Sequence, residues 1–179
     1  MAQDELTAAD ARRFADTLMG RELWSAAVAF LDEHAQLVES DFPLSWTLGW
    51  AHFKQKQFAE ARRCLQRATQ LAPQEWRGHW ALGLSCRSLG QYDQAEASLR
   101  EALRIRDTSL ARFFLALVYM EQGRSAEAEQ IHLDGIRIDP ESTERWEAYA
   151  DFLSDEGREA EAQEAYAKAH RSPGDPGVR

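Results

Sequence analysis

The residues of this chain that could do chemistry are its carboxylates, its histidines and two cysteines, and their spacing favours no reactive site. Acidic residues crowd the run from Glu156 to Glu164, but paired carboxylates work as acid and base only where a concave, partly dry setting separates their pKa values. Cys64 and Cys86 form no C-x-x-C pair and have no histidine at metal-ligand spacing. No two histidines stand four residues apart, as a helical metal site needs: His34, His52, His79, His132 and His170. We therefore predict no catalytic residue, no metal and no cofactor.

The composition narrows the classes of partner. The 179 residues are 44% hydrophobic and 28% charged, and no apolar run approaches the roughly 18 residues that a membrane span needs. Acidic residues outnumber basic ones by 30 to 21, and the resulting net charge of -9 disfavours nucleic acid and anionic lipid as partners. The first residues lack the features of a secretory signal, so we expect a cytoplasmic protein. Arginine outnumbers lysine by 18 to 3, a bias that favours a bacterial source.

The elements that would position a site repeat along the chain with a period of about 34 residues. Alanine recurs at Ala27, Ala61, Ala95, Ala128 and Ala162, and a small residue recurs upstream at Ala15, Gly49, Gly83, Ala116 and Ala150. Within each repeat the apolar residues follow the helical period twice, with a short break between, which predicts two antiparallel helices. Such a period is typical of a solenoid of stacked helix pairs.

The turn between the two helices of each repeat has its own pattern. Gly90, Gly123 and Gly157 occupy this turn in the last three repeats, which predicts a positive φ at each of them. Glu22 and Lys56 take the same position in the first two repeats, so we expect those two turns to be less well capped.

Two further local contacts follow from the pattern. The segment from Thr7 to Asp10 resembles a capping box at the start of the first helix. Where two helices cross closely, a large side chain would push their axes apart. We therefore predict that Gly49 faces Ala61 and that Gly83 faces Ala95.

These spaced residues resemble the tetratricopeptide repeat, in five copies. The second and third copies carry the resemblance at Leu48-Gly49, Phe58 to Ala61, Leu65, Ala68, Pro73, Leu82-Gly83, Gly90 to Ala95, Leu99 and Ala102. The fourth and fifth carry it at Leu115-Ala116, Tyr119, Gly123, Ala128, Pro140, Trp146, Ala150, Gly157, Ala162, Tyr166 and Ala169. The first copy is the weakest, with His34 where alanine is usual.

The resemblance implies a fold and its domain organisation. We expect an all-α, right-handed solenoid of five helix pairs forming a single domain over residues 8–170. Its repeats fall at about 8–41, 42–75, 76–108, 109–142 and 143–170. The remaining residues form an N-terminal extension, 1–7, and a tail, 171–179, whose composition predicts disorder.

The resemblance also implies a binding surface, because in this family the first helix of each repeat lines a concave face and three of its positions point toward the ligand. Here these positions predict a groove that is apolar and aromatic in the middle and charged at its ends: Trp46, Trp50, Phe53, Trp80, Leu84, Arg87, Phe113, Leu117, Met120, Glu147 and Asp151. Exposed aromatic residues that gather in this way mark an interaction site. Trp46 and Trp80 have an alternative place, between the helices instead of Ser45 and His79, and Met120 fits either core or groove.

The groove favours a non-enzymatic adaptor or chaperone that binds a peptide or protein segment. Glu144, Glu147 and Asp151 predict a basic flank on that segment at one end, and Arg12 and Arg13 predict a weak preference for an acidic flank at the other. The chain has no asparagine, which excludes the lysine, asparagine and arginine clamp by which some relatives hold a chaperone's C-terminal carboxylate.

Two alternatives remain open. The apolar groove also resembles the small tetratricopeptide chaperones of bacterial type III secretion, which hold a segment of a translocator or needle subunit. A self-associating structural or assembly subunit, such as a homodimer, would hide the same aromatic face against a second copy of the chain.

Overall fold

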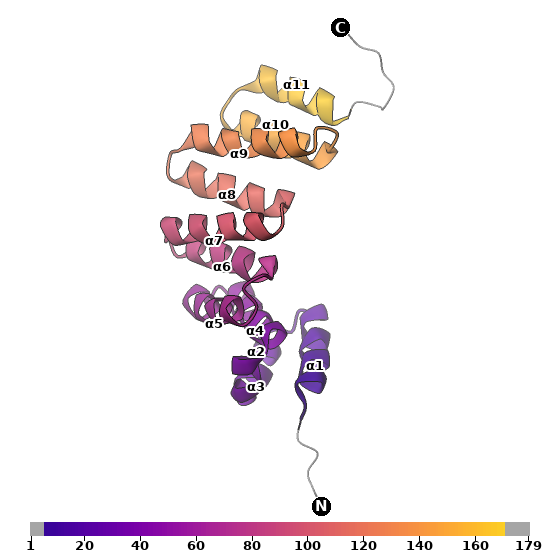
Figure 1. The fold of residues 1–179 in the computed structure, drawn as a ribbon, viewed down its shortest axis with the longest axis vertical. Helices are drawn as coiled ribbons and strands as arrows, with labels where there is room; N and C mark the ends of the chain where they lie inside the picture. Colours follow the sequence, from indigo (N-terminus) through magenta and orange to yellow (C-terminus); the bar gives the residue numbers. More distant parts are fainter. Residues whose placement is uncertain (1–5, 171–179) are drawn as a thin grey trace, which may run out of the picture. The chain divides into compact units, whose positions relative to one another are not determined.

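The computed structural model describes residues 6–170, and all regular structure in that range is helical (Figure 1). The N-terminal half holds α1 (Ala8–Gly20), α2 (Trp24–Glu33), α3 (Ala35–Ser40), α4 (Phe42–Lys54) and α5 (Phe58–Leu71). The rest holds α6 (Trp76–Ser88), α7 (Tyr92–Ile105), α8 (Ser109–Glu121), α9 (Ser125–Ile138), α10 (Thr143–Asp155) and α11 (Glu159–Ala169). Residues 1–5 of the predicted extension and the whole predicted tail, 171–179, lie outside the described range.

The helices pack in pairs within two compact units. In residues 1–106, α1 packs on α2, α4 on α5 and α6 on α7; in residues 107–179, α8 packs on α9 and α10 on α11. The five pairs fall in the five repeats predicted from the sequence. The boundary between the units lies in the turn where the spacing of the repeated alanines drops to 33 residues. The expectation of one continuous domain over 8–170 stays a prediction.

Four of the helices begin at side chains that satisfy their free amide groups. The residue before each helix accepts a hydrogen bond from a backbone N–H in the first turn, and these N-caps are Thr7, Asp41, Thr108 and Ser142. The first of them confirms the start predicted from the segment Thr7 to Asp10. Such caps stabilise a helix by about 1 kcal/mol each.

The predicted positive φ angles are present at the glycines of the last three repeats. They are 71° at Gly90, 71° at Gly123 and 75° at Gly157. Glu22 and Lys56 adopt the same left-handed conformation, with φ of 56° and 61°. L-residues other than glycine rarely adopt it, because Cβ then crowds the backbone.

The prediction that the first two turns are less well capped is wrong. In the turn that contains Lys56, the N–H of Gln57 donates to the carbonyl of His52 over 3.0 Å. In the corresponding turn that contains Gly90, the N–H of Gln91 donates to the carbonyl of Cys86 over 2.9 Å. The hydrogen bonds of the two turns are therefore equivalent. The difference between them is backbone strain alone.

The close crossing of α4 with α5 and of α6 with α7 depends on glycine, and a leucine lies nearer to each glycine than the predicted alanine. A Cβ placed on Gly49 would lie 2.6 Å from Cγ of Leu65, and one on Gly83 would lie 2.6 Å from Cγ of Leu99. At Gly83 the predicted Ala95 is also close, with its carbonyl oxygen 3.3 Å from the added Cβ, whereas at Gly49 the nearest atoms all belong to Leu65. Each leucine lies four residues after the alanine named from the sequence. It fills the space that the glycine leaves, because a fully buried leucine stabilises the pair more than an alanine does.

The second helix of the first repeat is broken, which the repeat pattern did not predict. Its backbone leaves the helical region at His34, whose Nδ1 lies 2.7 Å from the carbonyl oxygen of Phe30. The short helix α3 then runs in its place. Ser45 Oγ donates to the carbonyl of Val38, and Arg67 Nε donates to that of Glu39 over 2.8 Å, so two free carbonyls near the end of α3 are satisfied.

Candidate functional site

The predicted binding residues of the second repeat lie together on α4. Trp46, Trp50 and Phe53 are separated by four and three residues, which places them on one face of a helix. Their rings stack. The ring centroids of Trp46 and Trp50 are 5.9 Å apart at an interplanar angle of 8°, and those of Trp50 and Phe53 are 5.2 Å apart at 10°.

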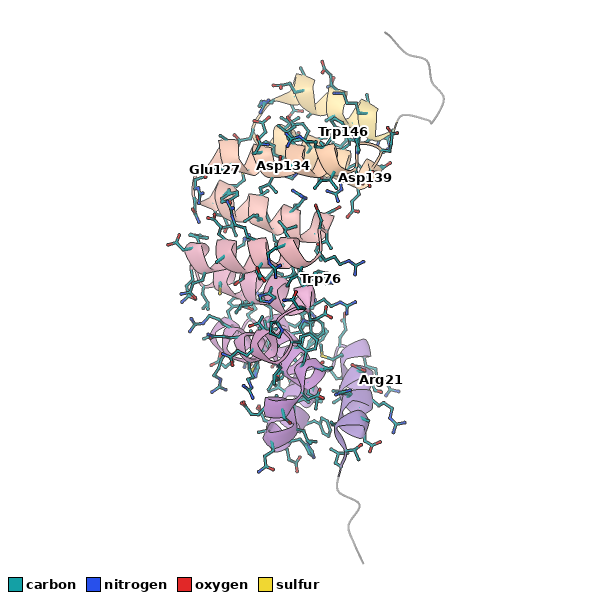
Figure 2. The ribbon with its side chains drawn as sticks, in the orientation of Figure 1. Arg21, Trp76, Glu127, Asp134, Asp139 and Trp146 are labelled. Atoms are coloured by element: carbon teal, nitrogen blue, oxygen red, sulfur yellow. The ribbon has the colours of Figure 1, made fainter. Side chains whose placement is uncertain are left out.

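The next repeat adds a fourth ring from α6. Trp80 lies 5.2 Å from Trp50, tilted by 35°. Trp76, labelled in Figure 2, lies at the start of α6. Its ring centroid is 6.3 Å from that of Trp80. Together, Trp46, Trp50, Phe53 and Trp80 form an aromatic surface. Aromatic pairs at such distances contribute about 0.5–1.5 kcal/mol beyond their buried area.

The aromatic surface is half-buried, so it belongs partly to the core and partly to the exterior. Its rings pack against a buried cluster of Ala61, Leu65 and Ala81. Ser45 is itself fully buried, whereas Trp46 and Trp80 are half-buried. Whether these two tryptophans serve the groove or the space between the helices stays open. The indole Nε1 of Trp46 is nevertheless buried, and no residue of the described range accepts a hydrogen bond from it. A buried donor without an acceptor is costly, by about 1–3 kcal/mol.

A cation of the chain lies over Trp50 of the aromatic surface, and others lie over the nearby Trp76, a feature that sequence reasoning missed. Lys54 Nζ is 5.5 Å from the ring centre of Trp24 and 5.7 Å from that of Trp50. The guanidinium groups of Arg77 and Arg106 each lie 5.7 Å from the ring of Trp76. The spacing of Lys54 four residues after Trp50 is a signal that could have found the first of these contacts.

Two predicted groove residues of α6 differ in accessibility. Leu84 is buried, with 4% of its surface exposed, and the expectation that it lines the binding surface is wrong. Arg87 is half-buried.

Residues 107–170 carry a smaller apolar surface. Phe113 is 41% exposed, and its ring lies 5.2 Å from that of Phe114 at an angle of 79°. Leu117 and Met120 are half-buried on the same helix, α8. Together these residues form an exposed apolar strip within this unit.

The predicted charged ends of the groove already have partners within the chain. His170 Nε2 lies 3.4 Å from the carboxylate of Glu147, and Asp151 accepts a hydrogen bond from the hydroxyl of Tyr166, which raises the pKa of that tyrosine. At the other end the guanidinium of Arg12 donates to the carboxylate of Asp41. These charges are thus less available to orient a ligand than the sequence suggested.

A buried charge cluster in residues 107–170 was also missed. The side chains of Arg112 and Arg145 are only 12% and 11% exposed. Arg112 donates to both oxygens of Asp107 over 2.9 and 2.6 Å, and Arg145 reaches the same carboxylate over 3.4 Å. The hydrogen bond from Arg112 lowers the pKa of Asp107. A Cβ on Gly135 would lie 2.9 Å from Nη1 of Arg145, so this glycine leaves room for the cluster.

The titratable groups of this unit do not form an acid–base pair suited to neutral pH. Burial lowers the pKa of His132 to about 4, and its ring lies 5.2 Å from that of Phe152. Burial together with a hydrogen bond of 2.8 Å to Glu129 raises the pKa of Tyr149 to about 12. Both groups therefore stay neutral at pH 7.

The described residues offer no assembled metal site and no membrane span. No three His, Cys, Asp or Glu side chains between residues 6 and 170 are grouped so that they could hold a metal ion. Within the same range, every helix is too short or too polar to cross a membrane. Cys64 and Cys86 are buried and unpaired.

Tandem helix pairs that display aromatic side chains from their first helices define a helical-repeat interaction protein. The tetratricopeptide repeat model matches residues 47–109 and 87–143, and the chain belongs to that family. Members of the family generally act as non-enzymatic modules that bind other proteins. The all-α solenoid fold predicted from the sequence is thereby confirmed.

Named relatives agree with this assignment. Human tetratricopeptide repeat protein 7B is 32% identical over 114 residues, which are 62% of this chain and only 13% of that protein. The crystal structure of MamA has a TM-score of 0.72 at 17% identity, covering 87% of this chain and 91% of MamA. A thermophilic TPR protein of Thermus thermophilus has a TM-score of 0.69 at 20% identity, covering 94% of this chain and 93% of that protein. At these identities the two structures show the fold.

Proposed function

We propose that this protein is a non-enzymatic adaptor that binds a segment of a partner protein, and that the aromatic surface supplies most of the affinity. The observation that carries the proposal is the stack of half-exposed rings on α4 and α6, in which Trp50 contacts Trp46, Phe53 and Trp80 at centroid distances of 5.2–5.9 Å. Partly exposed aromatic residues that form one cluster are the usual anchors of an interface.

The expected ligand presents apolar side chains to these rings. Truncating one such anchor commonly weakens binding by about 2 kcal/mol or more. A peptide backbone also offers carbonyl oxygens, which would accept from Nε1 of Trp46 once the ring turns toward the ligand. A bound peptide would thus supply an acceptor for the Trp46 indole N–H, which has none among the described residues.

The test compares two truncations of similar size within residues 1–106. Trp50→Ala removes the centre of the aromatic surface, and Phe14→Ala removes a ring that is 49% exposed elsewhere in this unit. A pull-down from a lysate of the source organism first selects proteins that bind the wild type and Phe14→Ala but not Trp50→Ala. Each selected protein is then purified, and its affinity for the three forms is measured by titration. Circular dichroism checks that both variants stay helical. Equal affinity of a purified partner for all three proteins would reject the aromatic surface as the binding site.

Self-association is a second candidate, because residues 107–170 expose three large apolar side chains. Ile138 is 60% exposed, Leu110 is 42% exposed and Phe113 is 41% exposed. Sedimentation of the wild type and of Phe113→Ser over a range of concentrations tests it. A dimer that dissociates in Phe113→Ser would favour an assembly subunit, whereas a monomer at all concentrations rejects it. The role of a type III secretion chaperone stays a prediction from the sequence.

A further inference from the structure

A cavity of about 430 Å³ lies within residues 1–106, away from the aromatic surface. It is lined by residues of α2, α3, α4 and α5. On α4 these are Ser45 and Leu48, whereas Trp46 and Trp50 turn toward the other side of the helix. The cavity adjoins the break at His34, where α3 runs in place of a continuous second helix. It shares no residue with the aromatic surface.

The floor of the cavity is apolar. Its lining includes Leu31, Val38, Leu48 and Cys64, each of which is less than 9% exposed. Burial raises the pKa of the Cys64 thiol, so this cysteine stays protonated and uncharged. A floor of this kind accommodates an aliphatic group.

The rim of the cavity carries one acidic and one basic side chain without an ionic partner. Asp32 on α2 and Arg63 on α5 both line the cavity, and neither forms an ion pair with a carboxylate or a cation of the described range. Within that range, the side chain of Arg63 hydrogen-bonds only to the uncharged thiol of Cys64. Arg67 differs, because its guanidinium is held by the backbone carbonyl of Glu39 and lies 3.3 Å from that residue's carboxylate. Unpaired charges are common on open surfaces, but here two opposite charges line the same cavity, beside its apolar floor.

We propose that this cavity binds a small amphipathic zwitterion of the class of free aliphatic amino acids. The carboxylate would pair with the guanidinium of Arg63, the ammonium group with Asp32, and the side chain would rest on the apolar floor. A volume of about 430 Å³ lies within the range of small-molecule sites, about 300–1,000 Å³. Gln66 and Gln70 on the same rim offer amide groups to the remaining hydrogen-bonding atoms. The proposal is independent of the aromatic surface.

L-leucine is the probe. Two-dimensional NMR of the labelled full chain follows its binding, and alkylation of the cysteines reports its location. Cys64, which is 8% exposed, lines the cavity, whereas Cys86, which is 1% exposed, does not. Leucine should therefore slow the alkylation of Cys64 without changing the slower alkylation of Cys86. Mass spectrometry of the two cysteine peptides measures both rates in one sample.

Exposed substitutions test the two charges without disturbing the core. Arg63→Gln and Asp32→Asn should each weaken leucine binding about five-fold, the effect of losing an exposed ion pair of about 1 kcal/mol. Arg137→Gln, an exposed arginine on α9, is the matched control and should leave binding unchanged. N-acetyl-leucinamide, which has the side chain but neither charge, should bind at least ten-fold more weakly than leucine.

Three outcomes would each overturn the proposal. In the first, leucine fails to slow the alkylation of Cys64; in the second, the neutral analogue binds as well as leucine; in the third, Arg63→Gln binds leucine like the control. Equal binding of the neutral analogue would reassign the cavity to an apolar residue within a partner polypeptide. Because Trp50→Ala leaves this cavity intact, failure here is distinguishable from failure of the aromatic surface.

Discussion

At the scale of single residues, the same backbone conformation recurs in five turns that do not share the same residue. Glycine adopts it in the last three repeats, whereas Glu22 and Lys56 adopt it in the first two with unchanged hydrogen bonds. A left-handed conformation costs an L-residue about 1–2 kcal/mol, and part of that is offset by the greater freedom of glycine in the unfolded chain.

Lys56→Gly should therefore stabilise the protein by about 0.5–1 kcal/mol. Urea denaturation followed by circular dichroism measures the change. Gly90→Ala is the converse variant, since the glycine there has a φ of 71° and open space around it, and it should destabilise by a similar amount. A decrease in stability on Lys56→Gly would show that the lysine side chain contributes more than the backbone strain removes.

His132 makes stability depend on pH. Burial lowers its pKa in the folded state to about 4 from the ordinary value of 6.5, so the unfolded state binds the additional proton between these values. Stability should fall as the pH decreases from 6.5 toward 4, by at most about 3 kcal/mol. His132→Phe should remove much of this dependence, and urea midpoints at about pH 7 and about pH 4.5 measure it. His79→Gln is the control, because His79 is not buried; an equal flattening in that variant would contradict the assignment.

At the scale of helices, the fit of α4 on α5 and of α6 on α7 depends on a glycine on the first helix and a leucine on the second. A Cβ on Gly49 would lie 2.6 Å from Cγ of Leu65 and 3.2 Å from its backbone nitrogen. The backbone nitrogen cannot move aside unless α5 itself moves. Packed interiors tolerate such additions poorly.

Gly49→Ala should therefore destabilise the protein by about 1–3 kcal/mol, although alanine favours a helix more than glycine does. Gly20→Ala is the matched control: its added Cβ meets no atom within 4 Å, and it should stabilise α1 slightly. Thermal unfolding of the two variants separates packing from helix propensity. Equal stabilisation by both would mean that the helix pair adjusts freely.

The charge cluster between α8, α9 and α10 gives a second prediction at this scale. Asp107→Ala leaves Arg112 and Arg145, which are 12% and 11% exposed, with only backbone carbonyls of the described range as acceptors. Losing the charged partner in such a partly buried setting costs about 1–3 kcal/mol. Asp134→Ala, which removes the partner of the exposed Arg137, should cost less than about 1 kcal/mol. Urea denaturation of both variants measures the contrast. Similar small losses would show that the buried arginines find other acceptors.

At the scale of the whole molecule, charge is divided unevenly along the chain. Residues 1–106 hold 14 acidic and 13 basic residues, whereas residues 107–179 hold 16 acidic and 8 basic residues. A partner bound at the aromatic surface meets a nearly balanced charge. A partner bound to the second unit meets an excess of negative charge.

Binding at the aromatic surface should therefore depend weakly on salt. Between about 0.05 M and about 0.5 M salt, the dissociation constant should change less than about three-fold, because screening acts mainly on net charge. Calorimetric titration of a purified partner at several salt concentrations measures this. A steep loss of affinity with salt would instead place a basic partner on residues 107–179.

The sequence by itself determined the helix pairs, the family and the left-handed turns, because periodicity and glycine act through neighbouring residues of the chain. It also placed Trp46, Trp50 and Phe53 on one face of a helix. Only the tertiary structure decided that Leu84 is buried, that Leu65 faces Gly49 and that Asp107 joins two arginines. Some of these contacts join residues far apart in sequence, and the others depend on how closely two helices approach. The local pattern of residues along the chain does not determine the distance between two helices. The cavity beside α3 was likewise decided by the tertiary structure, because it lies among residues of α2, α3, α4 and α5.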